Sequence, residues 1–291
     1  MKHNSWILVP ALALIAIGAT FKLSQAQSAA QPAPPAAPPK VESPRPAAPP
    51  PAPTPAMQAP SATPAVAGQK RLSFNACNVE GPYIAITFDD GPHATLTPRL
   101  LDMLKERGIK ATFFVLGQCV SSSPEVVHRA AAEGHEIANH SWDHKALTKG
   151  GGAGLATEVN STNAAIEQAG AKKPTLIRPP YGATNATVTR RLNEEYGLKV
   201  VLWDVDPLDW KVRNSAHVTS EILKHTQPGS IILAHDIHPT TIDAMPATLD
   251  ALLKKGFKFV TVSELIAMDR PQLPPKKEPA PPAKSPSQKK R

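Results

Sequence analysis

Two adjacent aspartates, Asp89 and Asp90, lie at the centre of the stretch TFDDGPH, which runs from Thr87 to His93. They follow apolar and β-branched residues that are typical of a buried strand, and a Gly-Pro break comes directly after them. Adjacent carboxylates repel each other and contribute nothing to the packing of a strand end. Because successive residues that leave a strand point in different directions, the two carboxylates can serve two different partners.

Two histidines, His140 and His144, lie four residues apart in the stretch HSWDH. This spacing predicts that both imidazoles lie on one side of a helical turn. Two imidazoles and one carboxylate form a ligand set for a divalent metal that keeps a position open for water. One aspartate of the pair would bind the metal, and the other would take a proton from the water that the metal activates. The alternative, two solvent-exposed histidines and two acids in a turn, leaves Arg178 unexplained.

Further polar residues follow strand-like segments elsewhere in the chain. They are Arg178 and Tyr181 in RPPY, Asp206, Asp209 and Trp210 in DPLDW, and His235 in LAH. In α/β barrels the carboxyl ends of the strands form the face that carries the active site. We therefore expect all these residues to meet the aspartate pair on one face of the domain.

The segments that must position these residues alternate between strand-like and helix-like patterns. The strand-like runs begin at Tyr83, Ala111, His135, Pro174, Lys199, Ser230 and Lys258. Helix-like segments lie between most of them, and three of these end at a glycine: 95–108, 121–134 and 241–256, the last with Pro246 expected near its start.

Seven short apolar strands that alternate with helices predict a parallel sheet whose outer face is covered. No glycine-rich phosphate loop follows the first strand. A closed α/β barrel is therefore favoured over a Rossmann-type sheet.

The stretches TFDDGP, HSWDH, RPPY, DPLDW and LAH, in this order, resemble the five motifs of the polysaccharide deacetylases, carbohydrate esterase family 4. The resemblance extends from about Pro82 to Leu265. It implies a distorted (β/α) barrel of about seven strands. It also implies a divalent metal, with Zn²⁺ expected and Co²⁺ or another ion as an alternative, and removal of N- or O-acetyl groups from a polysaccharide.

The resemblance also implies roles for the residues around the acid pair. Asp89 is similar to the catalytic base of the family and Asp90 to its metal-binding aspartate. His140 and His144 match the two other metal ligands. Arg178 matches the arginine that holds the base.

The remaining motifs match residues that act on the substrate. Tyr181 resembles the residue whose backbone N–H binds the oxyanion. His235 resembles the general acid that protonates the departing amine, and Asp209 resembles its partner. Trp210 and Leu233 match the residues that line the pocket for the acetyl methyl group.

The N-terminus has the pattern of an export signal. Lys2 precedes an apolar run, Trp6 to Ala19, that is too short to favour a membrane span, and small residues lead to Ala26. We expect residues 1–26 to be a cleaved signal peptide and the protein to be secreted or located in the periplasm or cell envelope. The alternative is an uncleaved membrane anchor.

Proline-rich segments flank the domain that we expect at residues 77–269. Residues 27–76, rich in proline and alanine, and the basic residues 270–291 lack the apolar side chains needed to form a core, so we expect disorder in both. The N-terminal segment would act as a spacer.

The formal net charge of the whole chain is +8, but residues 77–269 carry 19 lysines and arginines against 22 aspartates and glutamates. The absence of a basic excess argues against a nucleic-acid partner. The two cysteines, Cys77 and Cys119, allow one disulfide in an oxidising compartment or two unpaired thiols, and the sequence does not decide between them.

The sequence therefore predicts an exported, monomeric, metal-dependent deacetylase that acts on N-acetylglucosamine units of an envelope polysaccharide, with peptidoglycan as the expected substrate. The alternatives in the same class are a deacetylase of chitin or chito-oligosaccharides and an esterase for O-acetylated xylan. A more distant alternative is an inactive wall-binding module.

Overall fold

The computed structural model describes residues 71–270. The expected signal peptide and most of both proline-rich segments lie outside the described residues. The strands are β1 (Ser73–Phe74), β2 (Tyr83–Asp89), β3 (Thr112–Val115), β4 (Glu136–Asn139), β5 (Leu176–Ile177), β6 (Lys199–Val201), β7 (Ile231–His235) and β8 (Lys258–Phe259). All seven strand-like runs form strands, and β1 is an additional one.

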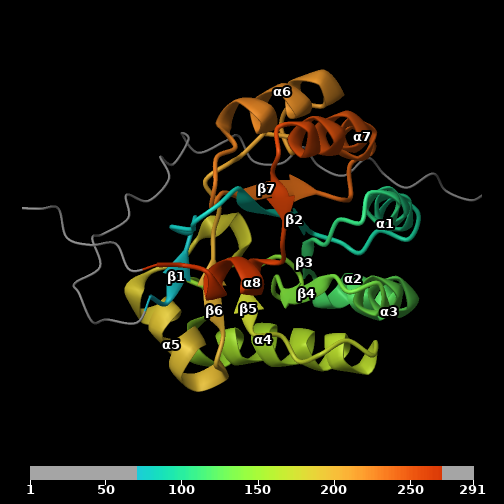
Figure 1. Ribbon diagram of the computed structural model, residues 1–291. Coiled ribbons are helices and arrows are strands. Elements are labelled where there is room, and N and C mark those ends of the chain that lie inside the picture. Colours follow the sequence, from blue (N-terminus) through green and yellow to red (C-terminus); the bar gives the residue numbers. More distant parts are fainter. Residues whose placement is uncertain (1–70, 271–291) are drawn as a thin grey trace, which may run out of the picture. The chain divides into compact units, whose positions relative to one another are not determined.

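The strands form one parallel sheet in the order β1-β6-β5-β4-β3-β2-β7, with β8 paired to β2 (Figure 1). The sheet curls, and an isolated parallel bridge between Val205 and Ile232 joins the segment after β6 to β7. This arrangement confirms the distorted (β/α) barrel and excludes a Rossmann-type sheet.

Helices surround the sheet; the last one along the chain contributes to the interior, and the others cover the outer face. They are α1 (Leu96–Glu106), α2 (Gly117–Ser122), α3 (Pro124–Ala132), α4 (Gly151–Gln168), α5 (Ala186–Tyr196), α6 (Ser215–His225), α7 (Pro239–Lys254) and α8 (Val262–Ala267). Figure 1 shows α6 beside α7, and α7 also contacts α1. Pro246 lies inside α7, which contradicts its expected place near the helix start. The helix starts instead at Pro239, where proline is tolerated because the first backbone N–H groups of a helix have no partner within the helix.

The interior of the curled sheet holds one buried apolar residue from each of the strands β1 to β7. They are Phe74, Ala85, Phe114, Ala138, Leu176, Val201 and Ile231. Two residues of α8, Val262 and Leu265, pack in the same cluster. The apolar layer fills the barrel interior, so polar side chains that face inward must lie beyond it, toward the carboxyl ends of the strands.

The folded part begins before Cys77, where we expected the linker to end. Strand β1 pairs with β6, and the side chain of Phe74 is buried. The Arg71 guanidinium lies 2.6 Å from the Asp269 carboxylate, which holds the two ends of the domain together. Cys77 and Cys119 are both free. Among the described helices, none is both long enough and apolar enough to cross a membrane.

Candidate active site

The alternation of side chains along β2 and β7 places an acid and a base next to each other. Ala85 and Ile231 face the barrel interior, so Asp89 and His235, each four residues further along its strand, face the same way. Asp89 and His235 are also partners in the register of the two parallel strands. The predicted base and the predicted acid therefore lie side by side where both strands end.

Arg178 lies against the apolar layer of the barrel interior, with its guanidinium 4.1 Å from the ring centroid of Phe114. It follows Leu176 by two residues and thus also faces inward. Its guanidinium is fully buried, and its Nη1 donates hydrogen bonds to Asp89 Oδ1 at 2.6 Å and to Thr87 Oγ1 at 2.7 Å. Its Nη2 donates to the carbonyl of Leu202 at 3.0 Å. A buried carboxylate with a buried counter-charge is fixed in position, which a base needs.

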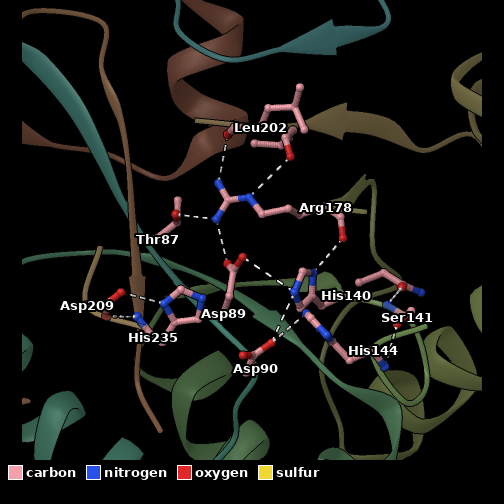
Figure 2. A network of polar contacts seen from close by, with 12 residues as sticks. Thr87, Asp89, Asp90, His140, Ser141, His144, Arg178, Leu202, Asp209 and His235 are labelled. Carbon is pink, nitrogen blue, oxygen red and sulfur yellow. Dashed lines mark hydrogen bonds and ion pairs between the residues drawn. The ribbon is translucent and has the colours of Figure 1, made fainter. Parts of the chain in front are cut away.

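The second aspartate points to the two histidines (Figure 2). Asp90 Oδ1 lies 3.3 Å from His140 Nε2 and 3.4 Å from His144 Nε2. The histidines do not lie on a helical turn, which corrects the prediction from their spacing. They belong to a loop after β4 in which Ser141 and His144 adopt left-handed backbone conformations, with φ of 73° and 64°. Two such residues bend the loop enough to bring imidazoles four residues apart to one point.

Buried hydrogen bonds hold this strained loop in place. The Asn139 side chain accepts a hydrogen bond from Ser141 N–H at 2.7 Å and donates one to Asn163 Oδ1 at 2.8 Å. Ser141 Oγ accepts from His144 N–H at 3.1 Å. Left-handed non-glycine residues cost of order 1–3 kcal/mol each, so the surrounding contacts must favour them strongly.

The three side chains fit a divalent metal. One ligand atom from each of Asp90, His140 and His144 lies within 4.8 Å of the other two. His140 Nδ1 lies 2.7 Å from the carbonyl oxygen of Arg178, so Nδ1 carries the proton and Nε2 presents its lone pair. Asp90 Oδ1 is buried and has no hydrogen-bond donor among the described residues. Two imidazole nitrogens and a carboxylate oxygen that converge on one point are the ligand set of a cation site.

The electrostatics agree with that reading. Burial raises the pKa of Asp90, but contact with His140 and the charges of both histidines outweigh this effect and hold that pKa well below its usual range. Burial and the nearby His140 lower the pKa of His144. The carboxylate is therefore ionised and His144 is neutral near pH 7, which is the form in which each binds a metal.

His235 lies on the other side of the acid pair from His140 and His144 in Figure 2. Its Nδ1 is 2.8 Å from Asp209 Oδ1. Burial lowers the pKa of His235, but the hydrogen bond and the charge of Asp209 outweigh it and raise this pKa to about 9. His235 is therefore protonated at neutral pH and can act as an acid.

The other predicted residues lie around this centre. Tyr181 is 69% exposed, and its ring packs edge-on against His144 with centroids 4.5 Å apart. Trp210 is exposed, and Asp206 accepts a hydrogen bond from Leu208 N–H in the same loop at 2.8 Å. Leu233 is buried on the inward face of β7, between Ile231 and His235. The roles of Tyr181, Trp210 and Leu233 toward the substrate remain predictions.

Several residues that support the site were not among the predictions. Thr87 lies two residues before Asp89 in β2 and therefore on the same face of the sheet, which the sequence alone could have shown. Asp236 is fully buried, accepts a hydrogen bond from Thr97 Oγ1 at 2.5 Å and lies against Gly91. Nothing local in the sequence marks this contact, because Gly91 and Asp236 come from opposite ends of the domain.

Comparisons with known proteins agree with the geometry. A family model described as polysaccharide deacetylase matches residues 77–201. A peptidoglycan-N-acetylglucosamine deacetylase of Listeria monocytogenes is 45% identical over 182 residues, which cover 62% of this chain and 38% of that protein. The chain thus spans well under half the length of this relative.

Two further matches cover nearly the whole of the related protein. A chitooligosaccharide deacetylase of Rhizobium leguminosarum bv. trifolii is 35% identical over 202 residues, 65% of this chain and 94% of that protein. The solved structure of a peptidoglycan N-acetylglucosamine deacetylase in complex with 4-naphthalen-1-yl-N-oxidanyl-benzamide is 32% identical, with a TM-score of 0.65, over 69% of this chain and 96% of that one. With these matches and the site geometry together, the chain belongs to the polysaccharide deacetylase family.

Proposed function

We propose that this protein is an exported, metal-dependent deacetylase that hydrolyses the N-acetyl groups of N-acetylglucosamine residues in peptidoglycan. The observation that carries the proposal is the placement of Asp89 and His235 beside each other at the Asp90–His140–His144 cluster. Hydrolysis of an amide needs a base for the water and an acid for the amine, and this site supplies both.

Each residue has one task in the reaction. A divalent metal, which we propose to be zinc, supplies Lewis acidity when it is held by Asp90, His140 and His144. Asp89 accepts the proton of the attacking water, and the hydrogen bond from Arg178 holds its carboxylate in orientation. The backbone N–H of Tyr181 stabilises the oxyanion.

The reaction ends with the departure of the amine. His235 donates its proton to the leaving nitrogen, because an amine leaves poorly without one. Asp209 orients the imidazolium through its hydrogen bond to Nδ1. Trp210 and Leu233 contact the methyl group of the acetyl substituent.

The substrate is proposed from two lines of support. The relatives that match include peptidoglycan deacetylases, and the export signal expected at residues 1–26 would deliver the protein to the cell envelope. The match to a chitooligosaccharide deacetylase makes chito-oligosaccharides the second candidate. An esterase for O-acetylated xylan is the third. We also propose that the domain acts as a monomer, with residues 27–70 as a spacer.

The test is to incubate the metal-loaded protein with purified peptidoglycan, chitin oligomers and acetylated xylan and to measure released acetate. We expect the fastest release from peptidoglycan. Release from chitin oligomers alone would support the second candidate, and release from xylan alone would refute an N-deacetylase. Sequencing the N-terminus of the exported protein, expected at Gln27, tests the signal; a retained Met1 would indicate the anchor.

A further inference from the structure

The carboxylate of Asp209 accepts hydrogen bonds from three donors. Its Oδ1 is 2.8 Å from His235 Nδ1, and its Oδ2 is 2.8 Å from the backbone nitrogen of His235. The third donor is the hydroxyl of Thr241, with Oγ1 at 2.7 Å from Oδ2. Asp209 and Thr241 are both fully buried, so no water competes with these bonds.

Thr241 reaches Asp209 from a separate element. It lies in the first turn of α7, and its backbone N–H bonds to the carbonyl of His238 at 3.0 Å. A hydroxyl in the first turn of a 16-residue helix is held rigidly. The N-terminus of that helix also favours the negative charge of Asp209.

We propose that Thr241 is a positioning residue for the acid histidine: its hydroxyl locks the rotation of the Asp209 carboxylate, and this orients the His235 ring toward the leaving amine. The inference rests on the proposed function, in which His235 donates that proton. Without the hydroxyl, Oδ2 would keep only the backbone donor, and the carboxylate and the ring bonded to it could turn together. No other described side chain donates to Oδ2.

The chain offers a matched control on the same helix. Thr248 is also fully buried in α7, but its hydroxyl bonds to the helix carbonyl of Ala244 at 2.8 Å and to Thr219 Oγ1 at 2.9 Å. Thr241→Val and Thr248→Val remove the same hydroxyl from similar surroundings while keeping the side-chain shape. Thr241→Ser keeps the donor and removes only a methyl group.

The experiment measures kcat, KM, metal content and thermal midpoint for the full-length metal-loaded variants on the substrate that the wild type deacetylates. We expect Thr241→Val to lower kcat roughly tenfold, with KM and metal content unchanged, because a hydrogen bond to a charged group is lost. Thr241→Ser and Thr248→Val should keep kcat within about threefold, and both valine variants should lose thermal stability similarly.

A second measurement does not depend on the substrate. The Nδ1–H proton of His235 should give a protected NMR signal in the wild type, in Thr241→Ser and in Thr248→Val, and should exchange with water faster in Thr241→Val. An unchanged signal and kcat in Thr241→Val would overturn the inference, as would an equal loss of kcat in Thr248→Val. Absence of acetate release by the wild type, with the NMR difference present, would refute the proposed function but leave the positioning role standing.

Discussion

Replacing each aspartate of the pair with asparagine removes one negative charge and keeps the shape of the side chain. The two variants should fail in different ways, because the two carboxylates have different partners. Asp90 lies within 3.4 Å of both histidine Nε2 atoms, whereas Asp89 binds Arg178 at 2.6 Å, is the register partner of His235 and lies 3.7 Å from the nearer of those nitrogens. The first should lose metal, and the second should lose turnover.

The expected loss for Asp90→Asn follows from its geometry. Its Oδ1 lies 3.3 and 3.4 Å from the two imidazole nitrogens and is the only anionic oxygen of the ligand set. Removal of a residue that only hydrogen-bonds to a metal ligand already lowers metal affinity about 10- to 100-fold. Removal of the charged ligand itself should lower metal affinity by more than this. Activity should return in part at high metal concentration.

Asp89→Asn should bind metal nearly as tightly as the wild type. The amide oxygen can still accept the hydrogen bond from Arg178, but the amide cannot take a proton. Turnover at saturating metal should fall on the order of 10²–10⁴-fold, the usual contribution of a general base. Because Arg178 is fully buried and would lose its counter-charge, the unfolding free energy should also drop by up to about 3–5 kcal/mol.

The assay measures bound metal per chain and acetate release at saturating metal for both variants, at a temperature where denaturation curves show each to be folded. Asp243→Asn is the control, because Asp243 is exposed and, among residues 71–270, its ion pair is with Arg99 on the surface. If the Asp89→Asn protein lost its metal and the Asp90→Asn protein kept it, the assignment of Asp90 as ligand and Asp89 as base would be reversed. Wild-type metal content and turnover in both variants would refute the metal-hydrolase mechanism.

Further tests address charge, packing and boundaries. In the metal-free protein, the unfolding free energy should fall as the pH rises from about 6.5 to about 9, because the folded state keeps the His235 proton up to a pKa of about 9 and the unfolded state does not. Denaturant titrations at a series of pH values measure this fall, and His235→Gln should make it smaller. Gly91→Ala should lower the unfolding free energy by about 1–3 kcal/mol and weaken metal binding, because the new Cβ would lie 2.5 Å from the buried carboxylate of Asp236. Gly154→Ala is the control: the space around it is open, so alanine should raise the unfolding free energy by about 0.5–1 kcal/mol. Calorimetry and metal titration compare the two variants. Deleting residues 71–76 should lower the thermal midpoint relative to a chain that begins at residue 71, since β1 and its buried phenylalanine are lost; equal midpoints would restore the boundary at Cys77.

The positions of the strands could be predicted because their apolar runs are local. All seven runs expected from the sequence are strands, and Asp89, His140, Arg178 and His235 lie at or directly after the ends of their strands. The period of two along β2 was enough to place Asp89 on the face of Ala85. The helical period failed for His140 and His144, because two left-handed residues replace the helical turn between them.

The sequence by itself determined the alternation of strands and helices and the family to which the chain belongs, and it predicted which residues bind the metal and which act as base and acid. These features depend on residue type and on spacing within a few residues, which the sequence displays directly. Only the tertiary structure decided which side chains complete the site: Asp209 and Thr241 meet across 32 residues, and Thr87 and Arg178 across 91. Such contacts depend on how whole helices and strands pack, and no local period encodes the distance between two elements.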